Sequence, residues 1–283
     1  MQIICSLIYN LLQKFSKGKN MPTVKIIEDR SYVQYHLEIS REKTRDAAIA
    51  IIPGAPERAA LIASHLENPV KIGSHRGLDS WLGKMGSLDI LVTNTGMGGP
   101  TLEIVVQELI QLGVKNFLRI GTTGAIQDYI PVGSLIVSEA AVRLDGTSDH
   151  YAPPCYPATG DLEMSLALKK ISDRLGHPCF SGLTASSATF FPGQERYDSA
   201  GGYVRRSIQG SLDEWRNLNV LNFEMEAASL FTICRTMGLR AACICAAVAN
   251  RTKSEAVVRD IIRRGEEAAT AVGLAMLKEV FGV

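Results

Sequence analysis

FLRIGTTGAIQ, residues Phe117 to Gln127, is the stretch that decides the fold, because an apolar run here meets a group of threonines and glycines. The pattern predicts the end of a buried strand that leads directly into a turn. One arginine, Arg119, lies inside the apolar run, and a desolvated guanidinium needs an anionic partner. Thr122 and Thr123 supply hydroxyl and N–H donors beside it. The stretch alone fits an oxyanion pocket and an arginine paired with a carboxylate at a strand end equally well.

The bulk composition is that of an ordinary globular protein. The chain has 283 residues, of which 46% are hydrophobic and 21% are charged, so it can bury a substantial core. Thirty basic and 29 acidic residues give a formal net charge of +1, and such a balance does not attract nucleic acid or an anionic membrane. The six cysteines form neither a CxxC pair nor a zinc-ligand spacing with histidine, which is typical of reduced thiols. We therefore expect a cytoplasmic protein without nucleic-acid or membrane partners.

The beginning of the chain carries an apolar run from Ile3 to Leu12. The run lacks a basic region ahead of it and a small-residue cleavage site behind it, and it is too short to span a bilayer. We expect residues 1–30 to form a loosely ordered extension, with Met21 a candidate alternative start, and residues 31–283 to form one domain.

Predicted strands and helices alternate along the rest of the chain. Short apolar runs bounded by glycine, proline or polar residues predict strands at residues 47–52, 69–72, 88–93, 116–120, 134–142, 178–187, 220–223 and 240–249. Helical periodicity predicts helices at residues 59–66, 102–113 and 161–175, one directly after Glu226, and a last one capped by Ser254. No linker or internal repeat interrupts the alternation. The pattern therefore favours a single α/β domain with a mixed sheet flanked by helices.

A glycine-rich segment, Gly96 to Pro100, separates a predicted strand from a predicted helix and raises the alternative of a dinucleotide site. Thr101 stands where the third glycine of G-x-G-x-x-G belongs, and no acidic residue closes the next strand. The dinucleotide alternative is therefore disfavoured.

Two further segments place polar groups after predicted strands, where open α/β sheets bind their ligands. Gly54 and Arg58 lie at a strand-to-helix junction that suits an anion. The loop from Phe190 to Tyr197 carries Gln194 and Arg196 beside an aromatic residue. Such a set can read the edge of a planar ring while a phenyl group stacks on its face. The alternative is a surface loop whose aromatic residues fill a local cluster.

Glu224 and Glu226 stand where a helix is predicted to begin, and carboxylates in a first turn are favoured by the helix dipole. Residues two apart on a helix point in different directions. We therefore expect at most one of the two to face a given ligand.

These motifs together resemble the nucleoside phosphorylase family, and within it the branch that acts on uridine. The resemblance extends from about Tyr35 to the C-terminus. Its motifs are PGAPER, SHR, FLRIGTTGAIQ, FFPGQERY and FEME, in that order along the chain. The resemblance implies an α/β fold with a central mixed, partly barrel-like sheet. It also implies a homo-oligomer, a hexamer built from dimers that complete one another's active sites.

The resemblance further implies a role for each matching residue, with inorganic phosphate as a co-substrate, no cofactor and no metal. The implied phosphate ligands are Gly54, Arg58, Arg119, Thr122 and, from a neighbouring subunit, Arg76. The implied ribose ligands are Thr122, Met225, Glu226 and a neighbour's His36. The implied base ligands are Thr123, Gly124, Phe190, Gln194 and Arg196. The residues implied to carry catalysis are Arg119, Thr122, Gln194, Arg196 and Glu226.

The implied reaction is the phosphorolysis of uridine to uracil and ribose 1-phosphate through an oxocarbenium-like sugar. The alternatives are a purine nucleoside phosphorylase or nucleosidase of the same fold, and a non-catalytic nucleoside-binding protein. Purine-cleaving relatives commonly carry Ser-Asp where this chain has Ala249-Asn250, and Asn250 cannot deliver the proton that a purine needs, which favours a pyrimidine. Two departures from the family pattern are Ala55, where an aspartate is frequent, and Gly77, which replaces a cation-binding glutamate. The segment after Arg251 is also shorter than the flexible lid of some relatives.

Overall fold

A closed β-barrel forms the centre of the structure, a computed structural model that describes residues 24–253, 255 and 259–283. Its strands are β5 (Asn116–Ala125), β6 (Leu135–Leu144), β8 (Cys179–Ser187), β9 (Val220–Glu224) and β10 (Arg240–Asn250). Around the barrel, β5 pairs with β10, β10 with β6, β6 with β8 and β8 with β9. The circle closes where β9 pairs with β5 in antiparallel orientation. Closure leaves these strands without a free edge.

The sheet continues beyond the barrel on the other side of β5. There β1 (Ile49–Ile51) lies parallel to β5 and to β4 (Leu88–Thr93), and β3 (Leu78–Met85) and the edge strand β2 (Glu67–His75) follow in antiparallel orientation. A two-residue strand, β7 (Ala158–Thr159), pairs with β6. All the predicted strands are present, but β3 and the two-residue β7 were missed. The expected fold class, an α/β domain with a mixed and partly barrel-like sheet, is confirmed.

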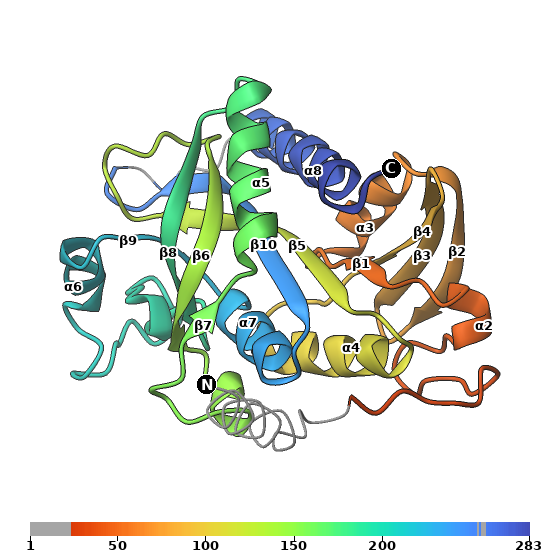
Figure 1. The fold of residues 1–283 in the computed structure, drawn as a ribbon. Helices are drawn as coiled ribbons and strands as arrows, with labels where there is room; N and C mark the ends of the chain where they lie inside the picture. Colours follow the sequence, from red (N-terminus) through yellow and green to blue (C-terminus); the bar gives the residue numbers. More distant parts are fainter. Residues whose placement is uncertain (1–23, 254, 256–258) are drawn as a thin grey trace, which may run out of the picture.

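Helices cover the sheet in two groups (Figure 1). In this view α8 (Arg259–Phe281) lies above β5 and β10, and α5 (Leu162–Arg174) runs from the top of the picture down beside β6. Together with α3 (Pro56–Ala63) they bury one apolar core. Below lie α4 (Gly99–Gln111) and α7 (Ala227–Thr236), which bury the second core. All five predicted helices are present as α3, α4, α5, α7 and α8, with boundaries within a few residues where the prediction gave them. Ser254, the expected cap of α8, lies outside the described residues. The short helices are α2 (Arg41–Thr44), α6 (Ser211–Asn217) and two 3-10 turns, η1 (Thr147–His150) and η2 (Pro192–Gln194).

The turn predicted within FLRIGTTGAIQ is wrong, because β5 continues as a strand to Ala125. Barrel closure supplies the reason, since this half of the strand is paired with β10 on one side and with β9 at its end. Gly121 is needed for close packing and not for a turn. A Cβ at this position would lie 2.9 Å from the Sγ of Cys245 on the adjacent strand and 3.3 Å from Nη2 of Arg119. The loop that follows begins only at Ile126.

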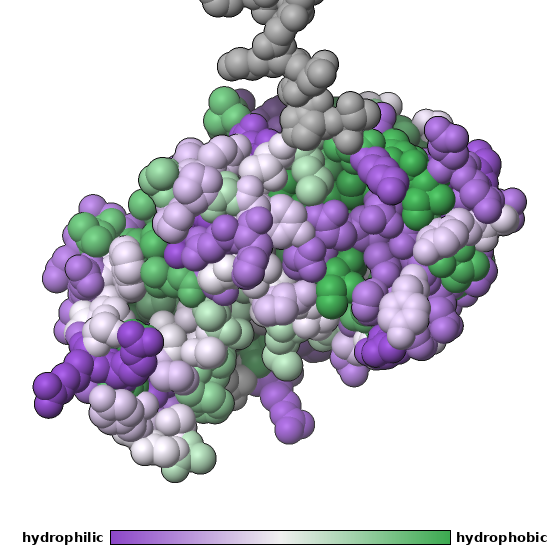
Figure 2. Space-filling view, turned by 90° about the horizontal axis from the view of Figure 1, so that it is seen from below, coloured by the Kyte–Doolittle hydropathy of each residue, from purple (hydrophilic) through white to green (hydrophobic). Residues whose placement is uncertain are grey.

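The face seen from below mixes hydrophilic residues with several separate groups of hydrophobic ones (Figure 2). The described helices include none with the length and apolar character that a membrane crossing needs. At the start of the described chain, Ile27 N donates to Gln111 O of α4 at 3.0 Å. The boundary expected at residue 30 stays a prediction, since residues 1–23 lie outside the described chain.

Candidate active site

A cavity of about 560 Å³ opens where the barrel meets the loops after β1, β4 and β8. Eleven of the residues implied to bind substrate line it, namely Gly54, Arg58, Arg119, Thr122, Thr123, Gly124, Phe190, Gln194, Arg196, Met225 and Glu226. They come from segments far apart in the sequence. Their convergence on one cavity makes it the candidate active site.

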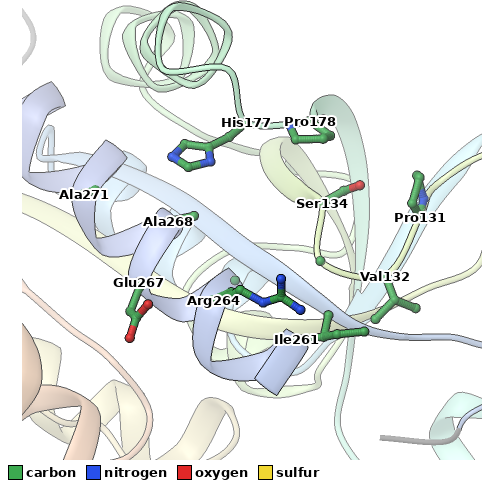
Figure 3. A pocket seen from close by; sticks show the side chains of 12 residues that line it. Pro131, Val132, Ser134, His177, Pro178, Ile261, Arg264, Glu267, Ala268 and Ala271 are labelled. Carbon is green, nitrogen blue, oxygen red and sulfur yellow. The ribbon is translucent and has the colours of Figure 1, made fainter. Parts of the chain in front are cut away.

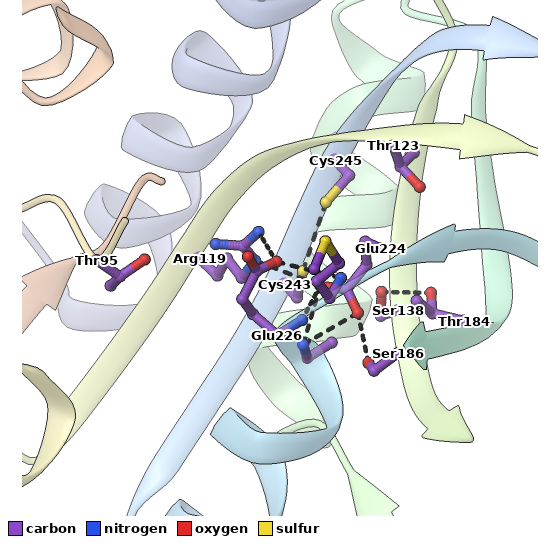
Figure 4. A network of polar contacts seen from close by, with 12 residues as sticks. Thr95, Arg119, Thr123, Ser138, Thr184, Ser186, Glu224, Glu226, Cys243 and Cys245 are labelled. Carbon is purple, nitrogen blue, oxygen red and sulfur yellow. Dashed lines mark hydrogen bonds and ion pairs between the residues drawn. The ribbon is translucent and has the colours of Figure 1, made fainter. Parts of the chain in front are cut away.

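Arg119 lies at the centre of this site and is only 4% exposed (Figure 4). Its Nη2 forms an ion pair with Glu226, and its Nε lies 3.5 Å from Oε2 of Glu224. Burial disfavours the charged guanidinium, but the carboxylates of Glu226 and Glu224 outweigh it and raise the pKa of Arg119 above its usual value. Nε and Nη1 are buried without a hydrogen-bond partner in the described part of the chain. The arginine therefore has carboxylate partners and also spare donors beside a cavity.

Glu224 and Glu226 both line the cavity, and the expectation that at most one of them faces a ligand stays a prediction. Glu224 ends β9 and the helix begins only at Ala227, so the spacing rule for helices does not apply between the two residues. Glu224 accepts hydrogen bonds from the backbone N–H groups of Glu226 and Ala227, both at 2.9 Å, which confirms its role at the helix start. Burial, and then the charge of Glu226, raise the pKa of Glu224 to about 7 against the opposing charge of Arg119.

The remaining oxygen of Glu226 is also engaged. Oε1 of Glu226 accepts from the backbone N–H of Gly98 at 2.6 Å. Gly98 has a φ of +88°, a backbone conformation that glycine adopts without strain, and it stands at the N-cap of α4. The glycine-rich segment thus holds a carboxylate in place at the candidate site.

Gly54 lies just before α3 and Arg58 lies in its first turn, after β1, which pairs with the first residues of β5. The Arg58 side chain is 11% exposed and forms an ion pair with Glu266 of α8. Gly54 permits close contact between two loops, because a Cβ there would lie 3.2 Å from the backbone oxygen of Gly96. Thr122 is half-buried, and its hydroxyl makes no hydrogen bond with other described residues. These groups together offer several donors to an anion.

Gln194 and Arg196 line the cavity from the loop after β8 and are 3% and 7% exposed. The Cζ atom of Arg196 lies 4.3 Å from the centre of the Phe190 ring, and its Nη1 pairs with Glu255. Phe190 also packs edge-on against Phe191, with ring centres 5.2 Å apart. The loop therefore forms a local aromatic cluster and lines a cavity at the same time.

Thr123 and Gly124 line the cavity at the end of β5, but the Thr123 O–H is already used as a donor. It donates to Phe223 O at 2.6 Å, and the same oxygen accepts from Nδ2 of Asn222 at 2.7 Å. The hydroxyl of Thr123 therefore has no donor left for a ligand. A Cβ at Gly124 would lie 3.6 Å from Cγ and Cδ of Arg251 and 3.9 Å from Nη2 of Arg196, which is ordinary van der Waals contact, so the two arginine side chains border this glycine.

His36 and Arg76, the two residues implied to act in a neighbouring subunit, do not line the cavity of their own chain. Arg76 donates from Nη2 to the Tyr35 hydroxyl at 3.0 Å, and the Tyr35 ring packs edge-on against His36. His36 Nδ1 lies 2.7 Å from Oε1 of Glu108. The two residues therefore lie near each other and apart from their own cavity.

Asn250 is buried and does not line the cavity. Its Nδ2 donates to two backbone oxygens, those of Gln127 and Ile130, each at 2.8 Å. Its Oδ1 accepts from the N–H and hydroxyl of Thr252 at 2.9 and 2.7 Å. Asn250 therefore ties two loops together.

Several residues of the cavity were missed from the sequence. Met97, Phe223, Val248 and Glu255 line it, and Ala249 does so beside Asn250. Alternation of small residues along β10 is the only sequence signal that points to Val248. Glu255 is found only from its ion pairs with arginines distant in sequence.

A second, larger cavity of about 670 Å³ lies between α8, the start of β6 and the turn before β8 (Figure 3). His177, Arg264 and Ser134 provide polar groups in its wall, and Glu267 is held by Arg263 at 2.9 Å. The residues expected to bind substrate all lie elsewhere. The arginine–carboxylate cluster therefore distinguishes the smaller cavity as the candidate active site.

Comparison with known protein families identifies the class of protein to which this barrel and cavity belong. Residues 48–278 match the phosphorylase superfamily, and the chain belongs to that superfamily. It is 46% identical to the uridine phosphorylase of Haemophilus influenzae over 238 residues. This matched stretch covers 84% of this chain and 94% of that protein. It is 43% identical to the uridine phosphorylase of Escherichia coli with the same coverage. A guanosine phosphorylase of Halorubrum lacusprofundi is 32% identical over 197 residues, 70% of this chain and 76% of that protein. The resemblance found from the motifs is confirmed.

Proposed function

We propose that the protein is an enzyme that cleaves uridine by phosphorolysis, giving uracil and ribose 1-phosphate. The names of its relatives support this activity. The observation that carries it is the set of groups that one cavity brings together. Arg58 and Arg119 offer guanidinium donors to an anion, and Glu226 offers a carboxylate to a sugar. Gln194 and Arg196 offer polar groups to the edge of a planar base.

Phosphate occupies the side of Arg58 in this proposal. The guanidinium groups of Arg58 and Arg119 make charge-assisted hydrogen bonds to its oxygens. Gly54 lets the backbone approach, and the free hydroxyl of Thr122 adds a donor. Arg76 of a neighbouring subunit completes the shell, which requires a homo-oligomer built from dimers.

Ribose lies across Glu226. A carboxylate accepts hydrogen bonds from two adjacent hydroxyls, and the contacts of Glu226 with Arg119 and Gly98 N fix its orientation. Met225 contacts the face of the sugar. A neighbour's His36, oriented by Glu108, donates to or accepts from the 5′-hydroxyl.

Uracil lies against Phe190, with its polar edge toward Gln194 and Arg196. Phosphate oxygen forms a bond to the anomeric carbon as the bond from that carbon to the base nitrogen breaks. The electron pair of the broken bond leaves with uracil, whose developing negative charge these two side chains stabilise. The proton that hydrogen phosphate loses on forming the ester passes through solvent to the uracil anion, which gives neutral uracil. Removing a positioned donor of this kind costs on the order of 100-fold in rate. Arginine and glutamine do not exchange protons near neutral pH, so positioning and electrostatics provide the catalysis.

The only second reactant in this scheme is inorganic phosphate, and the proposal includes no cofactor, no metal and no nucleic-acid or membrane partner. A cytoplasmic location and a hexamer of dimers are also part of the proposal. The relative named guanosine phosphorylase supports the one alternative, a purine substrate. Asn250 disfavours a purine substrate, because its amide NH2 group donates to two backbone oxygens and cannot protonate a purine.

An ultraviolet absorbance assay tests the proposal. The protein is incubated with uridine, thymidine, inosine or guanosine, each with and without phosphate. We expect the fastest cleavage with uridine and none without phosphate. Faster cleavage of a purine nucleoside would replace the substrate assignment, cleavage without phosphate would indicate a nucleosidase, and binding without turnover would indicate a nucleoside-binding protein.

A further inference from the structure

Both arginines on the anion side of the cavity are backed by a carboxylate. Arg119 pairs with Glu226, which lines the cavity, whereas Arg58 pairs with Glu266, which does not. The side chains of Arg58 and Glu266 are 11% and 22% exposed. An ion pair so shielded from water is screened less by salt than one on the surface. Glu266 therefore contacts Arg58 from outside the cavity.

The contact leaves most of the Arg58 guanidinium free. Nη2 donates to Oε1 of Glu266, while Nε is buried without a partner within the described residues. The five N–H donors of a guanidinium are fixed in one plane, so holding one nitrogen orients the others. Glu266 thus sets the direction in which Arg58 presents its remaining donors.

Glu266 is itself held by the close packing of α8 on the barrel. A Cβ at its neighbour Gly265 would lie 2.9 Å from Cβ of Ala246 on β10. A Cβ at Gly273 would lie 2.8 Å from Cδ1 of Ile120 on β5, the strand that carries Arg119. The two glycines bring the helix against both strands, and α8 packs with β5 and β10 in the same core. The position of Glu266 relative to Arg119 is therefore determined by the barrel.

We propose that Glu266 is a positioning residue for the phosphate site. It holds the guanidinium of Arg58, on α3, in the orientation in which Arg58 and Arg119, on β5, bind the same phosphate. The inference rests on the proposed function, because it assumes that these two arginines bind phosphate. In this role Glu266 touches neither reactant and acts only through Arg58.

The test measures the binding of inorganic phosphate to the full-length protein by isothermal titration calorimetry, so that it does not depend on turnover. We expect Glu266→Ala to raise the Kd for phosphate by about tenfold, because the guanidinium loses its fixed orientation. Glu266→Gln keeps an oxygen acceptor of the same shape and restores most of the affinity. Glu267→Ala is the matched control, since Glu267 is adjacent on the same helix, pairs with Arg263 and leaves the Kd unchanged.

A double-mutant comparison separates positioning from a general effect on the fold. If Glu266 acts through Arg58, adding Glu266→Ala to Arg58→Ala does not weaken phosphate binding further. A steady-state assay gives a second readout, in which Glu266→Ala raises the KM for phosphate and leaves the KM for uridine within about twofold.

The positioning role is overturned if Glu266→Ala binds phosphate as tightly as the wild type or more tightly, or if its effect persists without Arg58. A wild-type protein that does not bind phosphate would overturn the proposed site itself, and the inference with it. The two failures are therefore distinguishable.

Discussion

Arg119→Ala is the substitution whose effect follows most directly from the structure. The arginine is the cation placed between two buried carboxylates, Glu224 and Glu226. Removing one partner of a buried ion pair costs about 3–5 kcal/mol, because the other charge is left uncompensated. A protein of this kind has only about 5–15 kcal/mol of stability. We therefore expect the variant to lose about a fifth or more of its free energy of unfolding at pH 8, in addition to its affinity for phosphate.

The loss depends on pH with a defined sign. The pKa of Glu224 is raised on folding from 4.5 to about 7, and removing Arg119 takes away a charge that opposes this rise. A carboxyl with a raised pKa binds its proton more tightly in the folded state. Its contribution to stability is complete below the unfolded value of 4.5 and is lost as the pH rises through about 7. The deficit of Arg119→Ala is thus smaller at pH 5.5 than at pH 8.

Urea unfolding followed by circular dichroism at both pH values, at one protein concentration, measures the effect. Adding Glu226→Gln to Arg119→Ala removes one unpaired charge and is expected to recover part of the loss. The reasoning is refuted if Arg119→Ala stays within about 1 kcal/mol of the wild type at pH 8. It is also refuted if the deficit is the same at both pH values, or if Glu226→Gln recovers none of it.

Three further outcomes are expected. Gln194→Ala lowers kcat for uridine on the order of 100-fold and changes the KM for phosphate by less than about threefold; equal loss of both in steady-state kinetics would show that the loop is only structural. Gly121→Ala places a Cβ 2.9 Å from Sγ of Cys245 and destabilises the fold by about 1–3 kcal/mol. Adding Cys245→Ala relieves this crowding and raises the melting temperature again; no recovery would show that the two positions do not crowd each other. Asn250→Asp puts a carboxylate against two backbone oxygens and lowers the free energy of unfolding by about 1–3 kcal/mol. The variant does not cleave inosine in the absorbance assay, and a gain of purine activity would contradict the structural role of Asn250.

Most elements were predictable because each carries a local pattern. The run at Leu88–Thr93 is bounded as the apolar residues indicate, and Asp161 caps α5 by accepting from Met164 N at 3.0 Å. Strand β3 was missed because its buried and partly buried positions include serine, glycine and lysine, which weaken the alternation. The turn predicted after Ile120 failed for a different reason. Glycine in a strand and glycine in a turn look alike until the neighbouring strand is known.

The candidate site could be predicted in its members and only partly in its contacts. The family motifs predicted that Arg58 and Gln194 share one site, and both line the same cavity. Nothing in the sequence links Arg58 to Glu266, because 208 positions separate them. Glu224 and Glu226 both line the cavity although they are two residues apart, because they precede the helix and helical spacing does not apply to them. Long-range pairing and the exact start of an element decide such contacts, and neither is encoded locally.

The closed barrel has a consequence for which changes the protein tolerates. Because β5 is hydrogen-bonded to β10 along nearly its whole length and to β9 at its end, it has no free register in which to absorb an inserted or deleted residue. A shift by one position would turn Arg119 toward the opposite face of the sheet and Thr122 with it. Length variation in descendants of this chain is therefore confined to loops, while the strand at the centre of the site changes by substitution alone.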